Sequence, residues 1–287
     1  MSIPRTAAPR AATAGVDTPR HTRTRRALQV LTRSVASASV LLMAACGGPG
    51  EPATTATAQL GSCTVSAGPM AFLIGNRSNS PAVGADPQGV LAEGTQLAVE
   101  NDSNMMLADT GGMPQVLTIS SDDPSSTTPT ETLSPGRRVA NLHRAILHTQ
   151  ASAPEADPLE ALNLAVDHIQ AHGGSGTIVM VDSGLQTTGA LDYTQPGLLS
   201  VPATTLAERL ARSGKLPDLT GVTMVFVGLG TTARPQPKLN AASKDALKRH
   251  WLALARTAGA HCVTDAAAPE PGAAQAGLPG VSLVRVP

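Results

Sequence analysis

The chain has 287 residues, of which 41% are hydrophobic and 15% charged, a composition typical of one folded domain with extra segments at its ends. Its 21 basic residues balance its 21 acidic ones, and it has no run of about 18 uninterrupted apolar residues, which argues against nucleic-acid binding and against several membrane spans. Because only four side chains are aromatic, the core has to be built from Val, Leu, Ile, Met and Ala.

Residues 1–45 resemble the signal peptide of a bacterial lipoprotein. They contain seven arginines against the single acid Asp17, and the short apolar stretch 34–45 ends directly before Cys46. In such signals the cysteine receives a lipid and becomes the new N-terminus. The resemblance thus implies lipidation of Cys46. The alternative is a short buried helix that ends in a core cysteine, and Arg25-Arg26 also resembles a twin-arginine export motif.

The remainder of the chain is acidic once this segment is set aside. Without the seven arginines and Asp17, 14 of the 21 basic residues and 20 of the 21 acidic residues remain. Such a charge argues against electrostatic capture of phosphate polymers or anionic lipid headgroups, so membrane attachment would depend on acyl chains. Residues 46–69, rich in Gly, Pro, Ala and Thr over their first part, are expected to form a flexible tether.

The segment 70–287 is expected to form one α/β domain. Apolar runs predict strands at 70–74, 96–99, 115–119, 177–181, 222–227, around 262 and at 281–286, with the second and third joined as a hairpin. Apolar spacing predicts helices around 139–146, 159–169, 205–210 and 243–258. Continuous apolar strands that alternate with helices predict a three-layer open sheet, mostly parallel with an antiparallel edge, and with helices on both faces.

This order of elements resembles a von Willebrand factor A-like domain, a Rossmann-like fold. That family binds a divalent metal through a D-x-S-x-S loop after its first strand, a Thr between the early helices and an Asp after its fourth strand. The corresponding loop here reads Asn76-x-Ser78-x-Ser80, the helix junction offers Asp157, and the fourth strand is followed by Asp182. Asn76 and Asp157 depart from the family's residue types. The resemblance implies a degenerate metal site made of these five residues.

The chemistry of these residues leaves two interpretations open. Mg²⁺ and Ca²⁺ need oxygen ligands with some negative charge, and two carboxylates and two hydroxyls could supply them. Alternatively, Asp182 caps a turn, and Ser78 and Ser80 satisfy the backbone of their loop.

Three strings carry a finer resemblance. Residues 177–193, residues 216–230 and the Pro235-Gln236-Pro237 turn are similar to the N-terminal region of actinobacterial envelope lipoproteins of the outer-membrane-protein-A-like family. Many members continue into a peptidoglycan-binding domain, which would begin near Pro287. The resemblance implies an envelope protein, but direct anchoring to peptidoglycan is not expected.

Three other motifs partly match enzyme or cofactor sites. The glycines of 228–233 follow a strand but precede a proline-rich turn rather than a helix, which argues against nucleotide binding. His168 and His172 lack the intervening Glu of a metalloprotease helix. Ser183 lacks the glycine two places earlier that a hydrolase nucleophile needs.

Cys63 and Cys262 remain after Cys46 is assigned to a lipid. Two leftover thiols in an oxidising exterior can pair, so a disulfide between them is a hypothesis.

Together these features predict a membrane-anchored lipoprotein on the extracytoplasmic face that acts as a binding or scaffolding module, not an enzyme. The expected binding surface is formed by the loops at Asn76, Asp157, Asp182 and Gly228, with or without Mg²⁺ or Ca²⁺. Neither nucleic acid nor nucleotide is an expected partner. The alternative is an envelope hydrolase or metal-dependent enzyme that uses Asp182 and Ser183.

Overall fold

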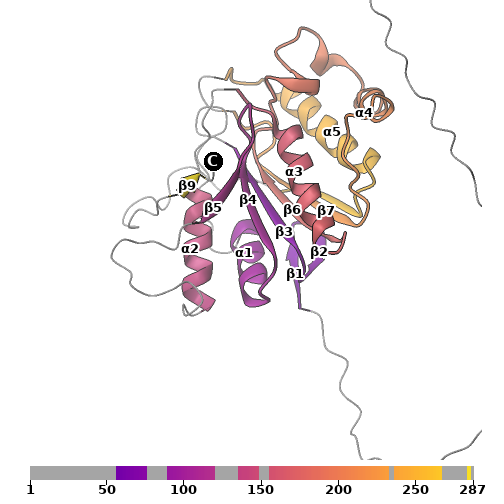
Figure 1. The fold of residues 1–287 in the computed structure, drawn as a ribbon. Coiled ribbons are helices and arrows are strands. Elements are labelled where there is room, and N and C mark those ends of the chain that lie inside the picture. The colour runs from indigo at the N-terminus through magenta and orange to yellow at the C-terminus, as the bar shows by residue number, and fades with distance from the viewer. Residues whose placement is uncertain are drawn as a thin grey trace, which may run out of the picture. The chain divides into compact units, whose positions relative to one another are not determined.

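A computed structural model of the chain describes residues 56–75, 89–119, 135–148, 155–232, 236–266 and 283–285, all within the compact unit Glu51–Pro287 (Figure 1). Its strands are β1 (Thr57–Leu60), β2 (Cys63–Ser66), β3 (Met70–Ile74), β4 (Met105–Asp109), β5 (Val116–Ile119), β6 (Gly176–Val181), β7 (Val222–Val227), β8 (Cys262–Ala266) and β9 (Leu283–Arg285). Its helices are α1 (Val90–Glu100), α2 (Pro135–His148), α3 (Pro158–Ala171), α4 (Ala203–Arg212) and α5 (Ala241–Thr257), with 3-10 turns η2 (Gly189–Leu191) and η3 (Leu198–Ser200).

The main sheet has seven strands in the order β8-β7-β6-β3-β4-β5-β9. The five strands from β8 to β4 are parallel, β5 pairs antiparallel with β4, and β9 pairs antiparallel with β5. When β3 to β8 are counted as strands one to six, the order is the 3-2-1-4-5-6 of a doubly wound sheet. The predicted class, a mostly parallel open sheet of the von Willebrand factor A-like (Rossmann-like) kind with an antiparallel edge, is confirmed.

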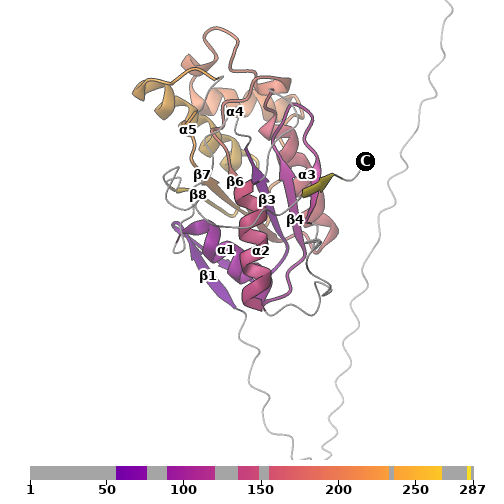
Figure 2. The same cartoon turned by 90° about the vertical axis from the view of Figure 1, so that its left-hand side faces the viewer.

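The alternating side chains of the central strands build two cores, one on each face of the sheet. Ala71 and Leu73 of β3 pack with α3, α4 and α5, whereas Met70, Phe72 and Ile74 of the same strand pack with α1, α2 and the β1–β2 hairpin. Figures 1 and 2 show these helices on opposite faces. A strand buried on both faces has to be apolar at every position, which explains the continuous apolar runs.

Two helix starts follow simple capping chemistry. Asp157 caps α3 by accepting a hydrogen bond from the backbone N–H of Glu160, and Asn240 caps α5 through the N–H of Ser243. The helix expected around 205–210 is α4, which begins at Ala203 without a side-chain cap. Within the part of the chain that the structure describes, no helix is long and apolar enough to cross a membrane.

The predicted strand at 96–99 was wrong. These residues lie in α1, whose buried positions include Leu91, Thr95 and Ala98, three or four residues apart as in a helix that covers a sheet. Four apolar residues are too few for periodicity to distinguish a strand from a buried helix. The strand that pairs with β5 is β4, which lies in the stretch expected to connect the two strands of the hairpin. The predicted edge strand is confirmed by β9.

The predicted tether extended too far. Thr57–Leu60 and Cys63–Ser66 form an antiparallel hairpin whose Leu60, Cys63 and Val65 are buried against the domain. Its alternation of buried and exposed positions is the pattern of a half-buried strand, hidden in sequence by short polar residues. The folded domain therefore includes residues from 56 onward, and Cys46 and the rest of the expected tether lie outside the described residues.

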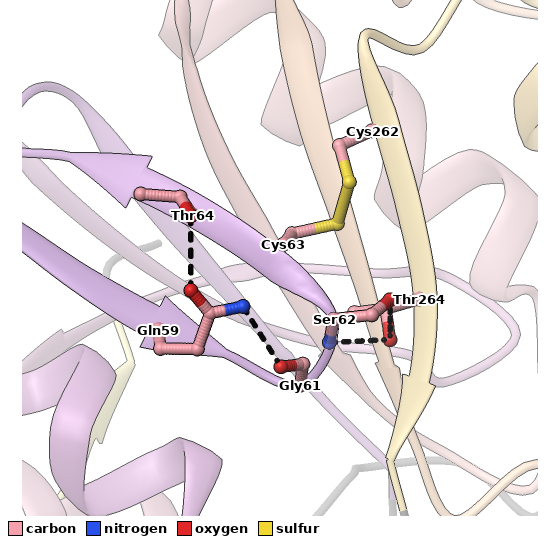
Figure 3. The surroundings of a disulfide bond; sticks show 7 residues. All are labelled: Gln59, Gly61, Ser62, Cys63, Thr64, Cys262 and Thr264. Carbon is pink, nitrogen blue, oxygen red and sulfur yellow. Dashed lines mark hydrogen bonds between the residues drawn. A yellow bond between two sulfur atoms is a disulfide. The ribbon is translucent and has the colours of Figure 1, made fainter.

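The hairpin is joined to β8 by the Cys63–Cys262 disulfide, across 199 residues of sequence (Figure 3). Beside it, the backbone N–H of Ser62 and its hydroxyl donate to Thr264 Oγ1, at 3.2 and 3.0 Å. The structure thus brings together the two cysteines of the disulfide hypothesis. The bond ties the first strands to the last strand of the parallel part of the sheet.

Loss of this disulfide is expected to lower the free energy of unfolding by about 2 to 5 kcal/mol, because it closes a long loop in the unfolded chain. Urea unfolding of the wild type, of the Cys63→Ser/Cys262→Ser variant and of both under reductant measures the effect. The variant should be insensitive to reductant. An unchanged unfolding midpoint in the reduced wild type would contradict the expectation.

Candidate functional site

The carboxyl ends of β3, β4 and β6 meet where the strand order reverses. β3 lies between β4 and β6, and the backbone N–H of Gly75, which follows β3, donates to Val181 O of β6 at 2.6 Å. On the other side, Thr110 N–H donates to Ile74 O at 3.2 Å. In open α/β sheets ligands bind at this point, which makes it the first place to look for a site.

Asp182 lies at the end of β6 and is 2% exposed. Its Oδ2 accepts a hydrogen bond from the Thr110 hydroxyl at 2.6 Å, and its Oδ1 accepts one from the backbone N–H of Gly184 at 2.6 Å. Burial raises the pKa of the Asp182 carboxyl to about 6, although the two hydrogen bonds oppose the shift. Both oxygens are thus engaged by the protein, as in the turn-capping interpretation.

Thr110 was missed in the sequence. It follows β4, is fully buried, and connects both predicted carboxylates, because its carbonyl accepts the backbone N–H of Asp157 at 3.0 Å while its hydroxyl reaches Asp182. A threonine directly after an apolar strand was the available signal, but this strand was not recognised. Asp109, the residue before it, is also buried, and its Oδ1 accepts the backbone N–H groups of Gly111 and Gln115.

The segment 182–189 is held from several sides. The carbonyl of Gly184 accepts the indole N–H of Trp251 in α5 at 2.8 Å, and Thr187 exchanges hydrogen bonds with Ala156 before α3. Gln186 Oε1 accepts the backbone N–H of Leu159 at 3.2 Å. Gly184 has a φ of +72°, and a Cβ there would meet the Trp251 ring at 2.5 Å, so only glycine fits. The segment 182–189 therefore forms a rigid connection between helices and sheet.

Ser183 lies in the same segment and is 1% exposed. Its hydroxyl donates to Gln236 Oε1 at 3.3 Å and accepts the backbone N–H of Leu185 at 3.2 Å. Gln236 in turn donates from Nε2 to Leu185 O at 2.9 Å. These bonds link the loop after β6 to the turn after β7 and give Ser183 a role within the loop.

The structure describes only two of the five predicted metal residues, Asp157 and Asp182. Asp157 and Asp182 come together at this end of the sheet through Thr110, and burial raises the pKa of Asp157. Asn76, Ser78 and Ser80 lie outside the described residues. Within the described ranges no cluster of three or more His, Cys, Asp or Glu side chains is arranged to hold a metal. The described oxygens, already hydrogen-bonded, do not form a cation site on their own.

The remaining motifs also have definite places. Gly228 and Gly230 have positive φ values, and Gly230 N–H donates to Ser183 O at 2.7 Å, while the next helix begins only at Ala241. The loop at Gly228 therefore belongs to the same end of the sheet as Asp182, as expected.

The two histidines of the other motif lie at the end of α3. The His168 and His172 rings are 4.5 Å apart, and His168 Nε2 is 3.2 Å from Asn104 O.

Comparisons with known proteins do not assign the chain to a family. No protein-family model matches the chain, and no curated protein matches it. Among solved structures it is similar to the human COPII-coat protein Sec24c, with 10% identity and a TM-score of 0.34 over 71% of this chain. The match spans 30% of that protein's chain. The function has to be argued from the site itself.

The ionisation of Asp182 should make stability depend on pH. Because its folded pKa, about 6, lies above the ordinary 3.8, its contribution opposes folding fully above pH 6 and disappears as the pH falls towards 4. In Asp182→Asn the amide oxygen can accept from Gly184 and the amide N–H can donate to Thr110, without a charge. The stability advantage of this variant should grow by about 2 kcal/mol from pH 4 to pH 7.

Urea unfolding of both proteins across this pH range measures the difference, in which all other titrating groups cancel. Asp167→Asn, at an exposed position of α3, is the matched control and should give a flat difference over the range. Parallel stability curves for the wild type and Asp182→Asn would show that the carboxyl keeps an ordinary pKa.

Proposed function

We propose that the protein is an extracytoplasmic, lipid-anchored lipoprotein that acts as a binding or scaffolding module of the cell envelope. The observation that carries the location is the Cys63–Cys262 disulfide, because such bonds persist in oxidising compartments and are rare in the cytosol. It agrees with the lipoprotein-like segment 1–45 and with the similarity of the chain to actinobacterial envelope lipoproteins.

The proposed binding surface is the crest, defined as the loops that follow β3, β4, β6 and β7. Thr110 and Asp182 join the loops after β4 and β6, and Gly230 and Ser183 join the loops after β7 and β6, so these three loops are held to one another. A surface positioned by rigid elements suits recognition. One observation argues against a hydrolase: the Ser183 hydroxyl is buried and engaged by Gln236 and by the backbone N–H of Leu185.

Substitution of Cys46 tests the anchor. Cys46→Ala should move the protein from the membrane fraction to the soluble extracytoplasmic fraction and abolish incorporation of a clickable palmitate analogue, because acyl chains supply the attachment. Cys262→Ser is the matched control and should keep both the lipid and the membrane location. Membrane retention of unlabelled Cys46→Ala would contradict the proposed anchor.

Calorimetry tests whether the crest binds a divalent cation. With the loop 76–80 supplying further oxygens, Mg²⁺ or Ca²⁺ should give a saturable heat of binding that Asp182→Asn weakens at least about tenfold. Asp218→Asn, which removes an exposed carboxylate outside the crest, should bind as the wild type does. A heat signal equal in Asp182→Asn would exclude metal binding at this residue, and the crest would then be a metal-free surface.

A further inference from the structure

A pocket of about 440 Å³ opens within the crest, where the segment 182–189 meets the turn at Gln236. Leu185 and Thr187 come from that segment, and Gln236, Pro237 and Leu239 come from the turn. Leu185, Thr187, Gln236 and Pro237 belong to two of the three strings that carry the finer family resemblance, and neither the proposed anchor nor the proposed metal site makes use of the pocket. Its volume lies within the range of small-molecule sites, roughly 300 to 1,000 Å³.

The wall of the pocket is mainly apolar. Leu185, Leu199, Leu239 and the ring of Tyr193 line it. Leu185 and Tyr193 are almost fully buried, so they shape the wall, whereas Leu199 and Leu239 keep part of their surface accessible to a ligand. Such a lining favours a ligand with an apolar body.

The pocket is built before any ligand arrives, because hydrogen bonds hold its wall. Gln236 donates to Leu185 O, and the backbone N–H of Tyr193 donates to Gln186 O at 2.9 Å. The Tyr193 hydroxyl lies 3.2 Å from Nδ1 of His250, whose Nε2 lies 2.8 Å from Val201 O. A carbonyl can only accept, so Nε2 carries the proton and the tyrosine donates to Nδ1. A preformed wall reduces the entropy lost on binding.

The polar groups of the pocket select the charge of the ligand. Glu155 is exposed. It is the only charged residue among the described lining residues, which include neither Lys nor Arg. Thr194, also on the wall, donates its hydroxyl proton to Asp192, whose pKa this bond lowers. Lys238 lies between two lining residues in the chain without lining the pocket itself. An anion would thus face the Glu155 carboxylate, whereas a cation would find a partner there.

We propose that this pocket is a binding site for a small molecule with an apolar body and one cationic amino group, the body against Leu199, Leu239 and Tyr193 and the amino group beside Glu155. The inference deepens the proposed binding role, on which it rests, but it depends neither on the lipid anchor nor on a metal. Lipid labelling and the metal titration test that role, so failure at the pocket can be told apart from failure of the module.

A matched pair of probes tests the proposal. 4-Phenylbutylamine and 4-phenylbutyrate have the same apolar body and opposite charge. Isothermal titration of the disulfide-bonded domain should show saturable binding of the amine and at least about tenfold weaker binding of the acid. Emission of Trp251, the one tryptophan of the chain, gives a second readout, because its indole N–H is bonded to Gly184 next to the wall residue Leu185.

Two variants assign the binding to the pocket. Glu155→Gln should weaken amine binding roughly three- to fivefold, the range for a largely exposed ion pair, and leave the acid unchanged or tighter. Leu239→Gln should weaken both compounds. Glu208→Gln, which removes an exposed carboxylate of α4 outside the pocket, is the matched control and should have no effect.

The outcomes separate the parts of the proposal. Equal affinity for the amine and the acid would overturn the assignment of a cationic ligand. Binding that neither Glu155→Gln nor Leu239→Gln weakens, or no saturable binding of either compound, would overturn the pocket as the site. Circular dichroism of each variant, compared with the wild type, shows that a loss of binding does not arise from unfolding.

Discussion

The hydrogen bond between Thr110 and Asp182 is the contact on which the end of the sheet depends. It connects the chain after β4 with the chain after β6, which are the two neighbours of β3, and so crosses the end of the strand that lies between them. A buried carboxylate without donors would cost several kcal/mol, and Thr110 and Gly184 supply those donors. These hydrogen bonds do not compensate fully, because burial still raises the pKa of Asp182. Ionisation of this carboxyl at the end of the sheet therefore has an electrostatic cost.

The residues next to Asp182 in the chain connect it to the surrounding loops. Its neighbour Ser183 is bonded to Gln236, and its neighbour Gly184 to Trp251, so the position of one carboxylate is coupled to the turn after β7 and to α5. The pocket is lined by residues of the same loops. A ligand in the pocket would therefore contact Leu185, which is only three residues from Asp182.

The sequence revealed the parts of the fold that are governed by long apolar patterns. β3, β6 and β7 are apolar at nearly every position, with the buried Thr177 and Thr223 as exceptions, and α3 and α5 show apolar spacing over several turns, so their existence and class could be predicted. Gln96 to Val99 could not, because a short apolar run fits both a strand and a buried helix. The β1–β2 hairpin could not either, since Thr and Ser fill its exposed positions and its burial depends on Cys63 meeting a residue far away in sequence.

The candidate site was predictable only at the residues that belong to a recognisable string. Asp182 follows a conspicuous apolar strand, whereas Thr110 follows one that was read as a turn, and its importance arises only when the sheet places β4 two strands away from β6. Gln236 is the same kind of case, because its role comes from the Ser183 hydroxyl and the Leu185 carbonyl that it meets. A polar residue can be identified from sequence by its type and local spacing, but its partners are set by strand order. The buried polar groups of a doubly wound sheet therefore become visible as a site only after the strand order is known.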